Sequence, residues 1–394
     1  MVGAGQAGAS LAMRLRAKAY DGAITVFGEE PYLPYQRPPL SKKYLSGEWE
    51  SDRLYLRSER HWQEAAIEIC TGDTVTAIDL VKRTLTWRGK GIRWDKLALT
   101  TGARPRPRPP GFEGRSGVFE LRSLADVNRI RAQFATGQTL LVIGGGFIGL
   151  ETAAVAIEAG LAVTVIEQAD RILERVVCRE TADYFRDLHR SKGVRILEGS
   201  SVSGLVGGSR VEGVELADGE TLDADLVLLG IGVVPNVELA QAAGLQIENG
   251  ILVDQHGRTS EQGIWAAGDC AAFPLDGKPT RLESVQNAID QSEAVADDML
   301  GLGDPYEPVP WFWSDQYDVK LQIAGLNRGH TEIIGRASRR GQSYWYFRNE
   351  ALVAVDAIGD AQAFMIAKRL IGSDIAIDPA QLADAEFDLK SLLS

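Results

Sequence analysis

The feature that most constrains the fold is a glycine pattern close to the start of the chain. Gly3-Ala4-Gly5-Gln6-Ala7-Gly8 matches GxGxxG, and it is followed by a helix-forming segment at 9–16 and an apolar strand-forming segment at 24–27. Glycines at this spacing let the backbone approach a pyrophosphate, which rests on the N-terminus of the helix. Glu29 follows the predicted strand, where an acid accepts hydrogen bonds from a ribose diol. The segment predicts a dinucleotide-binding unit.

The first strand of this unit is unusually short in the sequence. A strand ordinarily has about five residues. Only Met1 and Val2 precede Gly3. We therefore expect that a few native residues precede this sequence.

The same pattern recurs in the middle of the chain. Residues 139–143 are apolar and β-branched, which is typical of a buried parallel strand, and Gly144-Gly145-Gly146-Phe147-Ile148-Gly149 follows them. An alanine-rich helix is predicted up to Gly160, and a strand at 161–166 ends beside Glu167. One glycine-rich turn is weak evidence, but two copies with strand, helix and terminal acid predict two dinucleotide sites.

Composition favours a globular protein with two or three domains. The chain has 394 residues, of which 45% are hydrophobic and 24% are charged. Its net charge of −12 argues against nucleic acid as a partner. The three cysteines lie far apart without metal-ligand spacing, which favours a reducing cytoplasm over a disulfide framework. No segment resembles a leader or a membrane span, so no membrane partner is expected.

The rest of the chain predicts a hairpin, another buried strand and a third module. Asp218-Gly219 lies between strand-like segments and is a hairpin signal, and 226–230 is an apolar strand-like run. Residues 104–117 are rich in proline and arginine and indicate a linker. From about Trp311 the sequence predicts a separate α+β module, with strands at 344–347 and 352–355 and a helix at 363–370.

Two short segments indicate which cofactors the chain binds. Residues 97–103 (LALTTGA) and 264–269 (IWAAGD) both place small residues after an apolar start. They resemble the two signatures of the two-dinucleotide flavoprotein reductases, in which the final acid reaches the ribityl and pyrophosphate part of the flavin. This resemblance implies FAD at the first glycine-rich turn and NADH at the second.

The resemblance becomes specific at PYQRPPLSKKYLSG (34–47). Relatives that reduce disulfides carry a cysteine pair here, peroxidase and oxidase relatives use one cysteine in this region, and this chain has none. Together with GGGFIGLE, GIGVVPN, AAGDCA, LESVQNA and PWFWSDQY, the segment resembles the NADH-dependent ferredoxin reductases of bacterial oxygenase systems over almost the whole chain.

This family implies an α/β fold with the architecture of glutathione reductase. Two Rossmann-like dinucleotide-binding domains, one for FAD and one for NAD, are followed by a C-terminal α+β domain. We expect a discontinuous FAD-binding domain at 1–108 and 236–305, an NAD-binding domain at 109–235 and the C-terminal domain at 306–394.

The resemblance also implies which residues hold FAD. The first glycine-rich turn cradles the pyrophosphate, and an acid binds the adenosine ribose. A helix opened by Glu283-Ser284-Val285 is expected to point its N-terminus at the pyrimidine edge of the flavin. The matched positions are Gly3, Gly5, Ala7, Gly8, Glu29, Arg37, Lys42, Val75, Thr101, Gly102, Arg122, Asp269, Val285 and Trp313.

Two of the implied residues have a catalytic role. Lys42 matches a position beside the flavin and is expected to pair with Glu151 near nitrogen N5 of the ring. A cation there favours electron density on the reduced ring. The alternative for Lys42 is an ordinary solvated lysine.

For the second nucleotide, an acid sets the preference between NADH and NADPH. Glu167 accepts from a ribose 2′-hydroxyl and repels a 2′-phosphate, which favours NADH. Arg175 is a candidate partner for that 2′-phosphate, so NADPH remains the alternative nucleotide. The positions that match family contacts to NAD are Gly144, Gly146, Ile148, Gly149, Glu167, Arg175 and Gly232.

The aromatic and histidine residues carry less information. Trp311 and Trp313 flank Phe312; one of the two is expected in the core of the C-terminal module, and Trp313 is predicted to lie near the flavin, as the family implies. The four histidines form no triad or ligand spacing, so no catalytic role is assigned to them.

The implied function is electron transfer from NADH through FAD to a 2Fe-2S ferredoxin that supplies an oxygenase such as a cytochrome monooxygenase. Docking is expected to be transient, on a monomer or weak dimer. A reductase for rubredoxin or a nitrite-reducing system is an alternative, as is a signalling flavoprotein that resembles apoptosis-inducing factor. An acidic ferredoxin needs a local basic patch, for which the candidates are Arg336, Arg339, Arg340, Lys368 and Arg369, with scattered solvated charge as the alternative.

Overall fold

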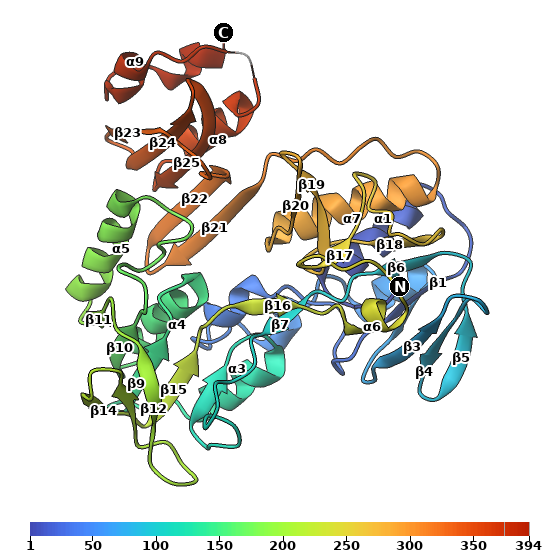
Figure 1. Cartoon of the computed structure of the whole chain (residues 1–394), viewed down its shortest axis with the longest axis horizontal. Coiled ribbons are helices and arrows are strands. Elements are labelled where there is room, and N and C mark those ends of the chain that lie inside the picture. The colour runs from blue at the N-terminus through green and yellow to red at the C-terminus, as the bar shows by residue number, and fades with distance from the viewer. Residues whose placement is uncertain (374, 394) are drawn as a thin grey trace. The chain divides into compact units, whose positions relative to one another are not determined.

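The computed structural model describes residues 1–373 and 375–393 (Figure 1). Its internal contacts divide the chain into two discontinuous units. Unit 1 comprises Met1–Gln36, Ser51–Arg104 and Val233–Pro310, and unit 2 comprises Arg37–Glu50, Pro105–Gly232 and Trp311–Ser394. The three-domain boundaries expected from the sequence stay a prediction.

Unit 1 is built on a parallel sheet that begins almost at the first residue. Val2 makes parallel bridges to both Leu99 and Phe27, so it lies between these two strands of the sheet. Around it, β2 pairs with β1, and β18 pairs with β6. The strands involved are β1 (Ile24–Phe27), β2 (Ile67–Cys70), β6 (Leu97–Leu99) and β18 (Ile264–Ala266).

Helices α1 (Gln6–Ala17) and α7 (Val285–Met299) pack against each other and against this sheet (Figure 1). Leu11 and Leu15 of α1 share one buried cluster with Val295 of α7. The other elements of unit 1 are α2 (Glu59–Glu64), α6 (Glu238–Ala242), β3 (Val75–Asp79), β4 (Thr84–Trp87), β5 (Lys90–Arg93), β16 (Val233–Pro235), β17 (Ile251–Leu252), β19 (Ala271–Leu275), β20 (Lys278–Thr280) and the 3-10 turn η2 (Ser51–Leu54). β7 (Ala103–Pro105) is the strand in which the chain leaves unit 1.

Unit 2 contains a five-stranded parallel sheet with the order β11-β10-β9-β15-β8. The strands predicted at 139–143, 161–166 and 226–230 are confirmed as β9, β10 and β15, and the predicted hairpin at Asp218-Gly219 joins β13 and β14. Strands of a parallel sheet are buried on both faces, as Leu141 and Val227 are here, and for this reason their sequences are continuous apolar runs. The elements are β8 (Val118–Glu120), α3 (Leu124–Arg131), β9 (Thr139–Ile143), α4 (Phe147–Glu158), β10 (Ala162–Ile166), α5 (Arg179–Ser191), β11 (Arg195–Leu197), β12 (Val202–Val206), β13 (Gly213–Leu216), β14 (Thr221–Asp223), β15 (Leu226–Leu229) and the 3-10 turn η1 (Pro38–Ser41).

The C-terminal part of unit 2 is an antiparallel sheet with the order β21-β22-β25-β24-β23. Helix α8 packs on it through Phe364 and Ile366, which share a buried cluster with Trp345. The predicted strands at 344–347 and 352–355 and the helix at 363–370 are confirmed. The elements are β21 (Trp311–Gln316), β22 (Val319–Gly325), β23 (Glu332–Ala337), β24 (Gln342–Arg348), β25 (Ala351–Ile358), α8 (Ala361–Leu370), α9 (Pro379–Ala383) and the 3-10 turn η3 (Leu389–Leu393). Over residues 1–373 and 375–393, no helix is long and apolar enough to cross a bilayer.

A buried carboxyl group joins the C-terminal sheet to helix α5. Asp356 Oδ2 accepts hydrogen bonds from the hydroxyls of Tyr346 and Thr181 and, at 3.4 Å, from the backbone N–H of Cys178. Burial raises the pKa of Asp356 from its ordinary 3.8 to about 6, against the lowering effect of these donors. The ionised carboxylate therefore destabilises the fold relative to its protonated form.

We expect Asp356→Asn to gain stability relative to the parent as the pH rises. The parent loses the contribution of the protonated carboxyl group between the unfolded pKa of 3.8 and the folded pKa of about 6, and this loss is at most about 3 kcal/mol. The amide has no proton to lose, so the difference in melting temperature, Asn minus parent, should grow from pH 5 to pH 7 and then level off. Parallel melting curves across that range would contradict the assignment.

Candidate functional site

The first glycine-rich turn is shaped by two close backbone approaches and one open position. A Cβ at Gly3, where φ is 114°, would lie 2.1 Å from the Thr100 carbonyl oxygen, and a Cβ at Gly8 would lie 2.0 Å from the Gly3 carbonyl oxygen. Gly5 is the N-cap of α1, has no side-chain cap, and a Cβ there would meet nothing within 4 Å. An uncapped helix N-terminus beside open space is what a bound pyrophosphate requires.

The second turn repeats this geometry. A Cβ at Gly144, where φ is 109°, would lie 2.4 Å from the Gly230 carbonyl oxygen, and a Cβ at Gly149 would lie 2.3 Å from the Gly144 carbonyl oxygen. Gly146 is the uncapped N-cap of α4, and a Cβ there would meet nothing within 4 Å. Ile148 in the first turn of this helix is 44% exposed. The two turns therefore have the same shape, each with open space at an uncapped helix N-terminus.

In unit 1, the segments that resemble flavoprotein signatures lie close to the first turn. Thr101 is held by Asn236: the Thr101 hydroxyl donates to the Asn236 carbonyl at 2.6 Å, and the Asn236 amide donates back at 2.8 Å. Gly268, just before Asp269, packs so closely on Ala7 that a Cβ would lie 3.0 Å from the Ala7 Cβ. Unit 1 thus contains these predicted FAD positions: Gly3, Gly5, Ala7, Gly8, Glu29, Val75, Thr101, Gly102, Asp269 and Val285.

Three further predicted FAD positions of unit 1 differ in their surroundings. Glu29 is exposed just after β1, and its predicted contact to a ribose stays a prediction. Val285 is the first residue of α7, and the side chain of Ser284 caps this helix by accepting from the Asn287 N–H at 3.1 Å. Val75 is buried at the start of β3.

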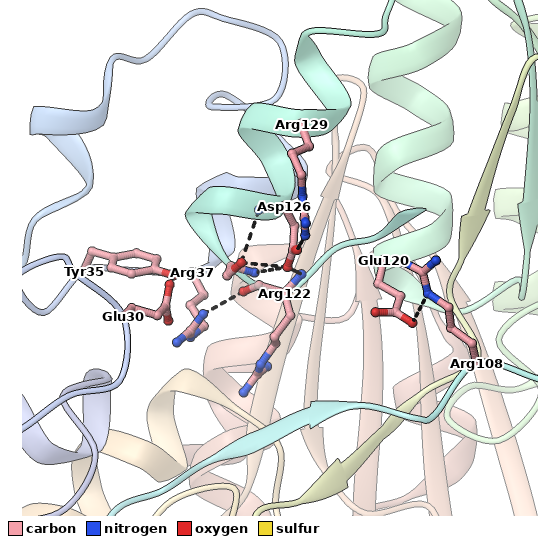
Figure 2. Close-up of polar contacts among 9 residues, drawn as sticks. Glu30, Tyr35, Arg37, Arg108, Glu120, Arg122, Asp126 and Arg129 are labelled. Atoms are coloured by element: carbon pink, nitrogen blue, oxygen red, sulfur yellow. Dashed lines mark hydrogen bonds and ion pairs between the residues drawn. The ribbon is translucent and has the colours of Figure 1, made fainter. Parts of the chain in front are cut away.

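The other predicted FAD positions belong to unit 2. Arg37 donates from Nη1 to the backbone carbonyl of Arg122 at 2.7 Å (Figure 2). The Arg122 and Ser123 N–H groups donate to Asp126 Oδ2 at 3.2 and 2.8 Å, which closes a capping box at the start of α3. Figure 2 also shows the unit 1 contact in which the Tyr35 hydroxyl donates to Glu30. Unit 2 contains Arg37, Lys42, Arg122 and Trp313 of the predicted FAD contacts.

Glu167 organises the second glycine-rich turn. Its two carboxylate oxygens accept the N–H groups of Gly145 and Ala169, each at 2.7 Å. The carboxylate thus lies against the turn at the end of β10, where a ribose is expected. Arg175 is exposed, and Gly232 has a φ of 95°.

A buried ion pair lies in unit 2 between segments that are far apart in the sequence. Lys42 Nζ lies 2.7 Å from Glu151 Oε2, and this confirms the predicted pairing of the two residues. The Ser41 hydroxyl donates to Oε2 at 2.6 Å, and the Ser314 hydroxyl donates to Oε1 at 2.6 Å. Glu151 is only 2% exposed. A buried carboxylate is tolerated when it is paired and its remaining lone pairs are satisfied, as here.

The two tryptophans of β21 have different surroundings. Trp311 packs edge-on against Phe364 of α8, and the Lys368 ammonium lies 4.9 Å from its ring centre. Trp311 therefore belongs to the core of the C-terminal module, as expected for one of the pair. The Trp313 ring contacts the Trp311 ring in a tilted arrangement, with 5.7 Å between ring centres, and Trp313 is half-buried. Its predicted role near the flavin stays a prediction.

The structure corrects one member of the proposed basic patch. Arg336 is only 6% exposed, so its charge is not available to a docking partner. Its guanidinium donates to the backbone carbonyls of Leu382, Asp384, Ala385 and Phe387. Sequence alone could not separate this residue from its exposed neighbours, because the carbonyls that it binds come from a distant segment.

Sequence reasoning also missed the groups that complete the ion pair. Ser41 lies next to Lys42, but nothing in its surroundings indicated a partner. Ser314 and Gln316 alternate along β21 with the half-buried Trp313 and Asp315, and both are buried. Two polar residues on one buried face of a strand were a usable signal, because buried polar groups need partners.

Comparisons with known proteins agree with these features. A family model described as pyridine nucleotide-disulphide oxidoreductase matches residues 1–292, and a model described as reductase C-terminal matches residues 311–393. Rhodocoxin reductase of Rhodococcus erythropolis is 40% identical over 99% of this chain and 93% of its own length. Putidaredoxin reductase CamA of Pseudomonas putida is 39% identical over 100% of this chain and 96% of its own length.

Solved structures give the same result. The ferredoxin reductase for the CYP199A2 system from Rhodopseudomonas palustris matches with a TM-score of 0.97 and 41% identity, over 100% of this chain and 98% of that one. Putidaredoxin reductase in its covalent complex with putidaredoxin matches with a TM-score of 0.96 and 39% identity, over 100% and 97%. The chain belongs to the pyridine nucleotide-disulphide oxidoreductase family and carries the reductase C-terminal domain of its ferredoxin reductase relatives.

Proposed function

We propose that this protein is a cytoplasmic, FAD-containing reductase that takes electrons from NADH and delivers them singly to a 2Fe-2S ferredoxin of an oxygenase system. The observation that carries the proposal is the pair of equivalent glycine-rich turns, each with an open N-cap glycine at an uncapped helix. Relatives named as reductases of putidaredoxin and rhodocoxin support the choice of electron acceptor. The three free cysteines support a reducing compartment.

The residues of each turn fit the group that they are proposed to hold. The first turn, with Glu29 and Asp269 at its edges, would hold FAD, and the second, with Glu167, would hold NADH. FAD, when bound, supplies the conversion of a two-electron donor into single electrons. The chain supplies binding, orientation and the charge of Lys42, which Glu151 holds in place.

Thiol chemistry is not part of the proposed electron route. Burial raises the pKa of Cys178 and Cys270, and burial followed by Glu68 raises that of Cys70. These thiols stay protonated near neutral pH, and a protonated thiol is a poor nucleophile. Electron transfer directly to an external acceptor is consistent with this set of thiols.

The proposal is tested by rapid mixing of the purified protein with NADH, followed by a panel of oxidised acceptors. NADH should bleach the flavin absorbance, and a 2Fe-2S ferredoxin should then be reduced with a stoichiometry of two per NADH. Preferential reduction of rubredoxin would identify the protein as a rubredoxin reductase instead. Absence of FAD, or no bleaching by NADH, would overturn the proposal.

We expect NADH to reduce the flavin at least about tenfold faster than NADPH. A tenfold ratio corresponds to a free-energy difference of only about 1.4 kcal/mol between the two nucleotides. The Glu167 carboxylate would oppose the 2′-phosphate of NADPH. Glu167→Ala should narrow the preference, and Glu167→Gln, which keeps an acceptor for one N–H of the turn, should separate the charge effect from the loss of loop contacts. Equal rates with both nucleotides in the parent would contradict this role of Glu167.

A further inference from the structure

Four consecutive hydrogen bonds connect the surface of unit 2 to the carboxylate of Glu151. The Tyr317 hydroxyl lies 2.9 Å from His189 Nδ1, and His189 Nε2 lies 2.8 Å from Gln316 Oε1. Gln316 Nε2 donates to Ser314 Oγ at 3.2 Å, and Ser314 Oγ donates to Glu151 Oε1 at 2.6 Å. We call these four residues, Tyr317, His189, Gln316 and Ser314, the donor chain.

The donor chain runs in one direction. The Gln316 carbonyl oxygen can only accept, so His189 carries its proton on Nε2, and the neutral ring then accepts from Tyr317 at Nδ1. The Ser314 hydroxyl has one proton, which it donates in the hydrogen bond to Glu151. If the Gln316 amide were reversed, Ser314 would face two acceptors with one proton, and one buried acceptor would lack a partner. Every donor in the chain therefore points toward Glu151.

Apart from the half-buried Tyr317 the donor chain is buried, and its buried members together with Glu151 come from three separate elements. Ser314, Gln316 and His189 are each 0% exposed. His189 lies on α5, Ser314 and Gln316 on β21, and Glu151 on α4. A row of buried polar side chains is costly to desolvate, so each member must be satisfied. All of its links are made, which makes the row a fixed frame and not a set of accidental contacts.

His189 is held neutral. Burial lowers the pKa of its imidazole, with the Gln316 hydrogen bond acting in the opposite direction. The charged groups near its outer partner are Lys192, whose ammonium lies 5.4 Å from the Tyr317 ring centre, and Glu158, which adds to burial in raising the pKa of Tyr317. The neutral ring supplies one donor to Gln316 without placing a second cation beside the Lys42–Glu151 pair.

We propose that His189 and Gln316 are positioning residues of the reductase reaction, which act through Ser314 to fix the orientation of the Glu151 carboxylate on Lys42. The proposal rests on the function proposed above. Oε1 of Glu151 accepts the hydrogen bond from Ser314, while Oε2 pairs with Lys42 and accepts from Ser41. The chain orients and does not conduct protons, because a primary amide would have to pass through its imidic acid form to relay one.

The kinetic test compares variants that break the chain with variants that keep it. Gln316→Leu and Ser314→Ala should lower the limiting rate of flavin reduction by NADH about tenfold while the Kd for NADH stays within about twofold, as expected when only positioning is lost. His189→Leu should act in the same direction, and His189→Gln, which keeps a donor toward Gln316, should restore most of the rate.

Ser343→Ala is the matched control for Ser314→Ala. Ser343 is also a fully buried serine of the C-terminal sheet, and its hydroxyl accepts from the Trp345 indole at 3.0 Å, away from the chain. It should change the melting temperature but not the limiting rate. If Ser314→Ala and Gln316→Leu keep the parent rate, the proposal is wrong. If the parent itself is not reduced by NADH, the failure lies in the proposed function instead.

A double-mutant cycle tests whether the chain acts through Glu151. In the Glu151→Gln background, Gln316→Leu should change the limiting rate by less than about twofold, because the carboxylate that the chain orients is gone. A merely structural role for Gln316 would reduce the rate by the same factor in both backgrounds, and that result would overturn the proposal.

Imidazole NMR provides a readout that does not depend on activity. In holoprotein labelled with ¹⁵N-histidine, with His189 assigned by its loss in His189→Gln, the ring should carry its proton on Nε2 and stay neutral at pH 7. Gln316→Leu should shift the Nε2 resonance because its acceptor is lost. Protonation at Nδ1 in the parent would reverse the direction of the chain and overturn the proposal.

Discussion

Gly5→Ala should give a folded protein that purifies without FAD, and Gly146→Ala should give a yellow protein that has lost tight binding of NADH. At both positions the added Cβ would meet nothing of the chain within 4 Å, and neither glycine has a positive φ, so folding should be preserved. The methyl group would occupy the space that the pyrophosphate needs beside the helix N-terminus. The two substitutions should therefore separate the two nucleotides.

The measurements are the flavin-to-protein ratio from absorbance and the Kd for NADH, with unfolding followed by circular dichroism. We expect each affected Kd to rise at least about 100-fold, or about 2.7 kcal/mol. Gly91→Ala in unit 1 and Gly204→Ala in unit 2 are matched controls, because their Cβ atoms also meet nothing within 4 Å. A Gly5→Ala protein that retains stoichiometric FAD would refute the assignment of the first turn.

Lys42→Met should slow flavin reduction by NADH at least about 100-fold while the Kd for NADH changes by less than about threefold. The ammonium is proposed to act on the redox ring and not on the nucleotide. The substitution also leaves the buried Glu151 carboxylate with only its two serine donors, which costs about 3–5 kcal/mol of stability. FAD content and melting temperature must therefore be measured with the rate.

The double variant Lys42→Met with Glu151→Gln separates these two effects. Removing both charges relieves the unpaired carboxylate, so the melting temperature should recover toward that of the parent. The rate should stay low, because the cation is still absent. If the rate recovered together with the melting temperature, Lys42 would have a purely structural role.

The parallel strands and the glycine-rich turns could be predicted because their signals are local. An apolar run such as 139–143 and a GxGxxG spacing both act over a few residues, and the structure has β9 and the turn at these positions. The pairing of Lys42 with Glu151 was expected from resemblance alone, because no local pattern joins residues so far apart. Val2 lies where the pattern places the first strand, with parallel bridges to Leu99 and Phe27.

The donor chain could not be predicted because it exists only after three elements have packed together. His189 lies on the same face of helix α5 as the buried Ala182 and Phe185, so helical spacing indicates burial of the ring but not the polar groups that it contacts. Gln316 and Ser314 were visible as an alternating pair, but their partners are on α4 and α5. Arg336 was misassigned for the same reason, since its carbonyl partners lie on a segment beyond α8.

The near identity of the two glycine-rich turns has a consequence for selectivity. Both nucleotides contain the same ADP moiety, and the turns present the same backbone shape to it, with Gly3, Gly5 and Gly8 in one and Gly144, Gly146 and Gly149 in the other. Neither turn can therefore distinguish FAD from NADH by its glycines. The distinction must come from groups that touch the rest of each molecule. Within the helices, Gln6 and the buried Ala7 of one turn are replaced by Phe147 and the exposed Ile148 of the other.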